Sequence, residues 1–263
     1  MRRLAFLFVG AALNLTFGPT GSMAAEPVAT IFMSPEAGVL VTMPAGTDGV
    51  VTLTDDDVAV AAVNIDAVQS LVGNSIIDQG GNRSVDFLGS GNFLSGVLSV
   101  NQEAGNMNNQ ANIRSIAIAM ANGGLGDVQI NVNTSQELRN NNLEVLNAGA
   151  TSVTIDNSFN NGSGIVGINQ TAGNLNQQLS VVAIGIGLNV GPDAIQVGDA
   201  QLGQIGTDAD NHRTDDGTLD TGHNSLTNSF NDFTGIAQVS QVTGDMNRVT
   251  QAVAVSITTT AAP

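Results

Sequence analysis

One sequence unit occurs three times in this chain of 263 residues. The copies, which align without gaps, are "GVLSVNQEAGNMNNQANIRSIAIAM" from Gly96, "GIVGINQTAGNLNQQLSVVAIGIGL" from Gly164 and "GIAQVSQVTGDMNRVTQAVAVSI" from Gly235. Their central glycines, Gly105, Gly173 and Gly244, are 68 and 71 residues apart. Self-similarity at such a period is typical of proteins in which each repeat stacks on its neighbours. The repetition therefore predicts a stack of three imperfect repeats of roughly 70 residues each.

Each copy has the pattern of a strand, a turn and a second strand. Before the turn, Leu98, Val100 and Gln102 share one face, and this period of two is typical of a β-strand. Gly105 followed by Asn106 then supplies the positive φ angle or the Asx geometry of a tight turn. The chain is expected to bend or reverse at this point.

The strand after the turn alternates bulky residues with very small ones. In the second copy, Ile184 and Ile186 alternate with Gly185 and Gly187. A helix is the alternative on composition alone, but the period of two and the β-branched residues favour a strand, and each interior Gly would cost a helix about 1 kcal/mol. Near-bare strand faces can pack closely against another layer. We therefore predict an all-β fold, as a β-solenoid-like or cross-β stack.

The chain is rich in amide side chains, with 29 Asn and 15 Gln beside 31 Gly and only 11% charged residues. This composition suits extended β-structure better than a compact catalytic domain. The alternating face of the first strand ends in Gln in all three copies, at Gln102, Gln170 and Gln241. Because a buried amide needs hydrogen-bond partners, we predict that each of these side chains binds the identical amide in the neighbouring layer.

The residue types that are missing exclude several classes of function. Without Cys the chain has no disulfide, thiol nucleophile or thiolate metal site, and because all seven basic residues are Arg it has no Schiff-base or P-loop lysine. A formal net charge of -16 repels nucleic acid and anionic lipid. We therefore expect no enzyme activity, no cofactor, no bound metal and no nucleic-acid partner.

The first residues have the pattern of a secretory signal peptide. Two Arg residues precede an apolar run over 4–17, and Ser22-Met23-Ala24 supplies small residues at the cleavage positions. A membrane anchor is the alternative, but the run is shorter than the roughly 20 residues that span a bilayer, and Gly18-Pro19 breaks it. Processing after residue 24 or 25 predicts a mature, exported protein.

The run "GIVGINQTAGNLNQQ" from Gly164 resembles the repeat of the Fap-type functional amyloid proteins of bacterial biofilms. The third copy departs from the pattern, because Ser240, Asp245, Arg248 and Val249 replace amides, and it is expected to act as a capping unit. The self-assembly ladder and turn positions that the resemblance implies are Asn101, Gln102, Gly105, Asn106, Asn108, Asn109, Gln110, Asn169, Gln170, Gly173, Asn174, Asn176, Gln177, Gln178, Gln241, Gly244 and Asn247.

The resemblance also implies a function and partners. Such proteins pass the outer membrane and assemble outside the cell into fibrils that reinforce a biofilm, so the implied partners are the protein itself, an outer-membrane secretion pore and other matrix subunits. The residues alone point the same way less specifically, since units that stack within one chain can also stack between chains. The alternative is a monomeric cell-surface adhesin or a carbohydrate-binding β-solenoid stalk.

The segments between the copies have weaker signals. Two Val-rich runs, Val39–Met43 and Val50–Thr54, predict a β-hairpin that caps the first repeat. The Asp-, Gly- and Thr-rich stretch Gly191–Asn224 predicts a long, exposed acidic loop. The resulting division of the chain is a signal peptide over 1–25, an N-terminal β segment over 26–84, repeat 1 over 85–152, repeat 2 over 153–222 and repeat 3 over 223–263.

The acidic stretch over 208–220 leaves a calcium site open as an alternative to a solvated loop, because hard cations favour clustered oxygens. Its spacing matches neither an EF-hand loop nor the glycine-rich calcium nonapeptide. His212 and His223 lie in the same stretch and are interpreted as solvent-exposed residues without a catalytic role.

Overall fold

The computed structural model describes residues 28–32, 41–44, 48–55, 58–121, 125–147, 149–188, 195–197, 201–205, 210–217 and 221–259. The signal peptide predicted over 1–25 lies outside these residues. Within them, no helix is long and apolar enough to cross a membrane.

The described residues form strands and turns, and none of them is helical. The all-β prediction is therefore confirmed for this part of the chain. The strands are β1 (Val28–Phe32), β2 (Val41–Pro44), β3 (Asp48–Asp55), β4 (Val58–Val72), β5 (Ser75–Asp78), β6 (Arg83–Leu88), β7 (Ser95–Ala104), β8 (Asn109–Ala121), β9 (Leu125–Arg139), β10 (Asn142–Val145), β11 (Ala150–Asp156), β12 (Ser163–Ala172), β13 (Gln177–Leu188), β14 (Ile195–Val197), β15 (Gln201–Ile205), β16 (His212–Asp215), β17 (Thr221–Thr227), β18 (Thr234–Thr243) and β19 (Arg248–Thr259).

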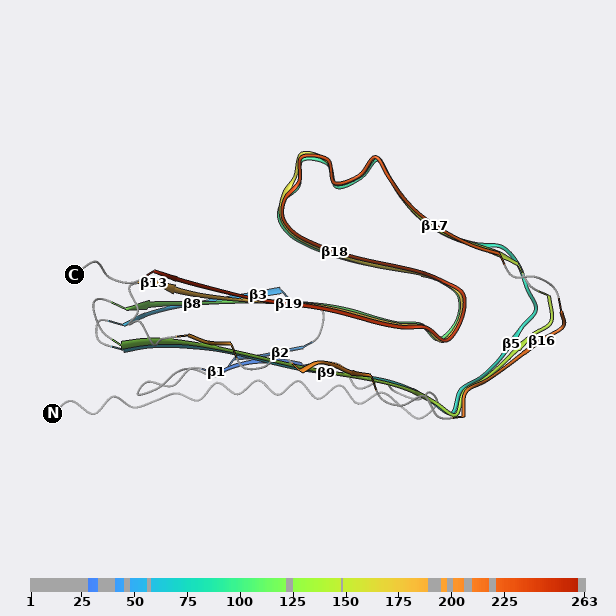
Figure 1. Ribbon diagram of the computed structural model, residues 1–263, viewed down its shortest axis with the longest axis horizontal. Coiled ribbons are helices and arrows are strands. Elements are labelled where there is room, and N and C mark those ends of the chain that lie inside the picture. The colour runs from blue at the N-terminus through green and yellow to red at the C-terminus, as the bar shows by residue number, and fades with distance from the viewer. Residues whose placement is uncertain are drawn as a thin grey trace.

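Three successive parts of the chain follow nearly the same path in space (Figure 1). We call them layer 1 (β4 to β8), layer 2 (β9 to β13) and layer 3 (β14 to β19). Each strand of layer 2 pairs in parallel with a strand of layer 1 on one edge and with layer 3 on the other, as in the orders β18-β12-β7 and β19-β13-β8. Layer 2 is therefore the middle of a stack of parallel sheets.

The pairing keeps equivalent residues of the three sequence copies side by side. In β12, Gln170 lies opposite Gln102 of β7 and Gln241 of β18. These residues are separated by 68 and 71 positions, the same separations as those between the central glycines. Because parallel strands in register place equivalent side chains on the same face, like residues form columns that run through the stack.

The core lies between strands that follow one another within a layer. The chain doubles back so that β12 lies between β11 and β13, and β13 lies between β12 and β9 (Figure 1). One apolar cluster joins Ile155 of β11 to Ile168 of β12, and another joins Val181 of β13 to Val128 and Ile130 of β9. Each layer therefore closes its own small cores, and the stack repeats them.

The small face of β13 is its more buried face. Gly185 and Ala183 are buried against β9, whereas Ile184 and Ile186 are only partly buried. A Cβ atom added to Gly185 would lie 2.4 Å from a methyl carbon of Val128, so the bulk of this core comes from β9. The small face therefore packs closely, as expected of a near-bare strand face, while the bulky face is partly open.

The N-terminal strands pair differently from the prediction. β2 pairs antiparallel with β1, which in turn pairs antiparallel with β4, and β3 pairs in parallel with β8. The hairpin predicted between Val39–Met43 and Val50–Thr54 does not form, because β3 extends the edge of the β8 sheet instead of folding back on β2.

The prediction of a long acidic loop over Gly191–Asn224 is wrong for the described residues of this stretch. β14, β15 and β16 lie in this stretch together with the start of β17, and they pair with β9, β10 and β11. The side chains of β16 are all exposed. Since the neighbouring layer supplies the backbone hydrogen bonds, a polar segment becomes a strand here without an apolar face.

Candidate functional site

The predicted glutamine positions form a column through all three layers. Nε2 of Gln170 donates to Oε1 of Gln102 at 2.7 Å, and Nε2 of Gln241 donates to Oε1 of Gln170 at 3.2 Å. Gln170 is completely buried. The amide in the middle layer thus finds its acceptor and its donor in identical residues, which offsets the cost of burying a polar group.

A second column contains Asn169, the residue that precedes Gln170. Asn169 donates from Nδ2 to Oδ1 of Asn101 at 3.1 Å and to the carbonyl oxygen of Ala111 at 2.9 Å. Its own Oδ1 accepts from the Ser180 hydroxyl at 2.9 Å. Ser240 takes the equivalent place in layer 3, so the asparagine column ends there. These contacts tie β12 to β8 and β13 within the stack.

An asparagine column also stabilises the turn between β12 and β13. Nδ2 of Asn176 donates to Oδ1 of Asn108 at 3.2 Å, and Nδ2 of Asn247 donates to Oδ1 of Asn176 at 3.0 Å. The backbone N–H groups of Asn176 and Asn247 donate to the same oxygens at 3.0 and 2.9 Å. Each accepting amide oxygen therefore receives two hydrogen bonds from the next layer.

The central glycines allow the turns to stack closely. A Cβ atom on Gly105 would lie 1.7 Å from the carbonyl oxygen of Gly173, and one on Gly173 would lie 1.9 Å from that of Gly244. The φ angles of the three residues are 149°, 147° and 98°. Only glycine adopts this backbone without strain and leaves room for the carbonyl group of the next layer.

The amides that follow the turn divide into two groups. Gln110 donates to Oε1 of Gln178 at 2.5 Å, so these two residues form a column of two layers. In layer 3 the register partner of Gln178 is Val249, and Gln178 donates instead to the Ser240 hydroxyl of β18 at 2.7 Å. Asn109 and Gln177 lie opposite each other, but no hydrogen bond between their side chains occurs among the described residues. Nε2 of Gln177 donates instead to the Glu137 carbonyl oxygen at 3.0 Å.

Further columns lie outside the three aligned copies. Asn74 donates to Oδ1 of Asn141 at 2.9 Å, and Asn141 donates to Oδ1 of Asn211 at 3.0 Å. Gln136 donates to Oε1 of Gln69 at 2.7 Å. These residues were not predicted from the sequence, although the separations of 67 and 70 positions in the asparagine column are close to the repeat period.

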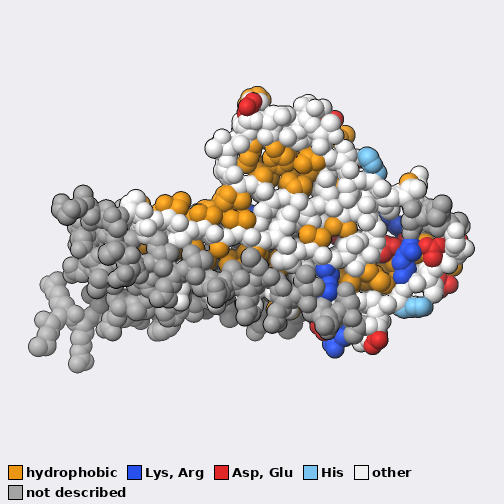
Figure 2. Space-filling view, viewed as in Figure 1, with side chains coloured by type: hydrophobic (Ala, Val, Ile, Leu, Met, Phe, Trp, Pro, Cys, Tyr) orange, Lys and Arg blue, Asp and Glu red, His pale blue; other side chains and the backbone are white. Residues whose placement is uncertain are grey.

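Three phenylalanine rings stack along the same axis. The ring centroids of Phe87 and Phe159 are 4.7 Å apart, and those of Phe159 and Phe230 are 4.9 Å apart. The position in layer 1 that matches Phe159 is Gly91, whose added Cβ would lie 2.5 Å from the Phe159 ring. Phe87 of β6 therefore supplies the ring in layer 1. Figure 2 shows the apolar side chains gathered between β17 and β18 at the layer 3 end of this cluster.

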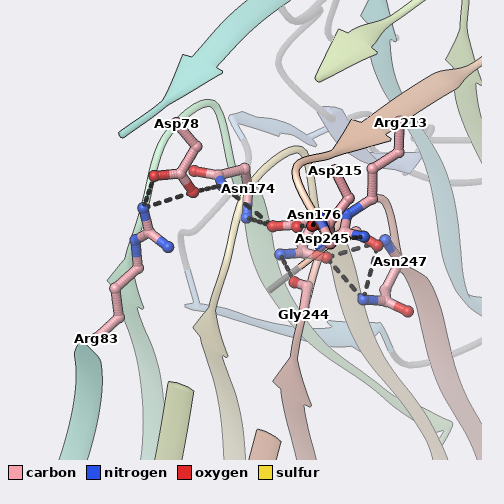
Figure 3. A network of polar contacts seen from close by, with 10 residues as sticks. Asp78, Arg83, Asn174, Asn176, Arg213, Asp215, Gly244, Asp245 and Asn247 are labelled. Atoms are coloured by element: carbon pink, nitrogen blue, oxygen red, sulfur yellow. Dashed lines mark hydrogen bonds and ion pairs between the residues drawn. The ribbon is translucent and has the colours of Figure 1, made fainter. Parts of the chain in front are cut away.

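The turn between the two strands of each copy holds a further column, formed by Asn106, Asn174 and Asp245, and an ion-pair network surrounds it. Nδ2 of Asn106 donates to Oδ1 of Asn174 at 3.2 Å, and Nδ2 of Asn174 donates to Asp245 at 3.1 Å and to Asp78 at 2.8 Å. Figure 3 shows Asn174 between the two carboxylates. Arg213 forms ion pairs with Asp245 at 3.3 Å and with Asp215 at 2.9 Å.

The carboxyl group of Asp78 is the most strongly held group of this network. Arg83 contacts both of its oxygens, at 2.6 and 2.7 Å, and the N–H of Gly80 donates to it at 3.0 Å. Burial of the Asp78 carboxyl group raises its pKa. The pKa is lowered by a larger amount by the hydrogen bonds from Arg83, Gly80 and Asn174 and by the positive charge of Arg83, so it lies below its usual value. The network therefore keeps a buried carboxylate ionised.

The two histidines predicted to be solvent-exposed lie on exposed strands. His212 begins β16 and His223 lies in β17, and both side chains are exposed. Among the described residues, no group of three or more His, Asp or Glu side chains is placed to hold a metal ion. Part of the stretch 208–220 lies outside the described residues.

The two ends of the stack present complementary amide atoms. Gln102 donates no hydrogen bond from Nε2 to any described residue, and Oε1 of Gln241 accepts none from them. The glutamine column thus ends in a donor at layer 1 and in an acceptor at layer 3. Figure 2 looks onto the layer 3 end, where β16 to β19 have described partners only in layer 2.

The sequence matches the model of the functional amyloid protein FapB/FapC family over residues 59–258. This match covers well over half of the chain. The chain belongs to the FapB/FapC family. No solved structure matches it.

The family match begins and ends with the three layers. It starts at the second residue of β4 and stops one residue before the end of β19, so it includes every column described above. FapB/FapC proteins are functional amyloid proteins, and they are extracellular. The family resemblance inferred from the amide-rich repeat is confirmed.

Proposed function

We propose that this FapB/FapC protein is a secreted structural protein whose copies stack head to tail into extracellular fibrils of a biofilm matrix. The fibril unit is a β-solenoid of three imperfect repeats, one for each layer, and no catalytic step is involved. An outer-membrane secretion pore and other matrix subunits are the further partners expected of such a protein.

The observation that carries this proposal is the match between the two ends of the stack. In a head-to-tail stack that continues the order β7-β12-β18, β7 of the next copy lies on β18. Gln102 of that copy then lies on Gln241, so the donor that ends one column meets the acceptor that ends the other. The same step supplies backbone partners for two open strand edges.

Charge opposes this association and makes it sensitive to conditions. The formal charge of -16 becomes -18 once the two Arg residues of the predicted signal peptide are removed. Copies therefore repel each other, and either protonation of carboxylates or screening by salt weakens the repulsion. We expect the lag time of assembly to shorten as the pH falls towards about 4 or as salt is added. Lag times that stay constant across that range would reject this electrostatic contribution.

The test of the proposal is assembly of the purified mature protein. Fibrils that bind an amyloid dye and diffract near about 4.8 and 10 Å are expected, since these are the spacings between strands and between packed sheets. A protein that remains a stable monomer at high concentration and low pH would overturn the proposal and would favour the adhesin or stalk alternative.

A further inference from the structure

The N-terminal strands cover part of the open face of layer 1. β3 pairs in parallel with Arg114–Ala121 of β8 over all eight of its residues. β1 pairs antiparallel with Ala62–Asp66 of β4. Among the described strands, β5, β6 and β7 have partners only in layer 2. The layer 1 face is therefore covered at β4 and β8 and open between them.

β3 takes the place that a strand of a second copy would occupy. One edge of β8 pairs with β13, and the other edge pairs with β3. In a head-to-tail stack, this second edge would pair with β19 of the neighbouring copy. Since one strand edge has a single row of N–H and C=O groups, β8 cannot pair with both. β1 likewise takes the edge of β4 on which β14 and β15 of a neighbour would lie.

The strand register puts an acidic residue of β3 at a position opposite a buried arginine of β8, where a strand of a neighbouring copy would put an apolar residue. Arg114 is 1% exposed, and its guanidinium donates to the carbonyl oxygens of Ile113 and Ser180, both at 2.9 Å. The register places Asp48 of β3 opposite Arg114. In the stack, Val253 of the neighbouring copy would take that register position instead. A buried cation is stabilised by an acidic neighbour and gains nothing comparable from a valine.

We propose that β1 and β3 form a removable cap on layer 1, which competes with a second copy of this chain for the edges of β4 and β8. Asp48 strengthens this cap through its place opposite Arg114. The inference rests on the proposed head-to-tail stacking. A capped chain adds to a fibril through its open layer 3 face, but its layer 1 face accepts a neighbour only after the cap has left.

An engineered disulfide tests the cap directly. The register opposes Thr52 of β3 to Ile118 of β8, and neighbouring strands lie about 4.8 Å apart, within the range of Cα separations that a disulfide can bridge. The chain contains no Cys, so T52C/I118C introduces the only pair. The oxidised variant is expected to elongate wild-type seeds slower by about tenfold or more, and reduction is expected to restore the rate.

The locked variant should also act as a terminator. Added in small amounts to wild-type protein, it binds a fibril end through its open layer 3 face and then presents a covered layer 1 face. Growth at that end is expected to stop while growth at the other end continues, as followed by microscopy of single fibrils. Continued growth at both ends would contradict the cap.

The matched control locks two strands that stay paired in either state. I118C/I186C joins β8 to β13 at opposed positions, so its oxidised and reduced forms should elongate at the same rate. Equal rates for oxidised and reduced T52C/I118C would overturn the cap alone. Absence of fibrils from the wild-type protein would overturn the proposed stacking and the cap with it.

A second pair of variants tests the role of Asp48 without a crosslink. D48N removes the charge opposite Arg114, whereas D55N removes one charge at the other end of β3, opposite Ala121. Both variants have the same net charge. D48N is expected to shorten the lag time several-fold relative to D55N, and equal lag times would overturn the assigned role of Asp48.

Discussion

At the scale of single residues, the stack depends on buried amides that both donate and accept along one axis. Gln170 shows the requirement most clearly, because it is fully buried and bonded to Gln102 on one side and Gln241 on the other. A carboxylate of the same size has two acceptor oxygens and no donor. The columns therefore select amides over acids, although the two differ little in shape.

We expect Q170E to destabilise the folded chain by about 3 kcal/mol or more and to block fibril formation, because it leaves a buried charge beside the acceptor oxygen of Gln102. The control is Q129E, which makes the same change on an exposed side chain of β9. Urea unfolding of the monomer and dye-binding kinetics measure the two effects. Fibrils forming from Q170E at the native rate would show that the column is not needed.

The ionised Asp78 gives stability a defined pH dependence. Its folded-state pKa lies below the unfolded value of about 3.9, so its contribution is present above that pH and is lost as the pH falls through the folded pKa. We expect D78N to lower the free energy of unfolding by about 2 kcal/mol at pH 7, because Arg83 then loses its buried partner.

The difference between D78N and the wild type is expected to shrink as the pH falls below about 4, because the carboxylate of the unfolded wild-type chain, which has the higher pKa, is protonated first. D86N removes an equal charge from an exposed position of β6 and serves as the control. A difference between D78N and the wild type that stays constant from pH 3 to pH 7 would contradict the assigned role of the ion pair.

The sequence predicted the residues of most columns because the three copies align there without gaps. Asn141 was missed because its segment recurs with the period of the repeat but has too little sequence identity to the matching segments of the other layers. Gln177 was placed in a column on position alone, although its side chain points toward β9 and bonds to Glu137. The pair of Asp78 with Arg83 was also missed, because neither residue lies in the aligned copies.

At the scale of elements, each layer bends so that its strands enclose small apolar cores. The core between β11 and β12 contains the stacked rings of Phe87, Phe159 and Phe230. Phe159 is completely buried, and its ring contacts a ring in each neighbouring layer. The phenylalanine column stabilises the apolar core by stacking identical rings along the axis, as the amide columns stabilise buried polar groups by hydrogen-bonding identical amides along it.

We expect F159A to destabilise the chain by about 4 kcal/mol, because it opens a cavity and removes both ring contacts. F93A removes a ring that is 76% exposed and should change stability by less than about 0.5 kcal/mol. The midpoints of urea unfolding for the two variants provide the comparison. Equal effects would contradict the stacked core.

The sequence predicted elements well where apolar periodicity was present and poorly where it was absent. β12 and β13 were expected from their alternating residues and the turn between them. β16 was not, since its residues are polar and exposed and its backbone is paired by β10 of the layer beneath. β3 was paired with the wrong strand, because sequence proximity favoured a hairpin over the distant edge of β8.

At the scale of the whole molecule, the chain is a short segment of a parallel stack with two unlike ends. The order of the strands, the direction of the glutamine column and the cap on layer 1 all distinguish one end from the other. A fibril built from such units has a polarity, and each chain contributes three layers to it. The repeat period predicted this stacking, whereas the cap depends on the pairing of β1 and β3, which the sequence did not reveal.

The stack of three layers is tested most directly by the mass per length of fibrils of the mature protein, measured by scanning transmission electron microscopy. Three layers for each chain, with a spacing of about 4.8 Å, predict one chain per about 14 Å of each protofilament. One chain per about 4.8 Å would mean that each chain adds a single layer, and would contradict the stack of three layers described here.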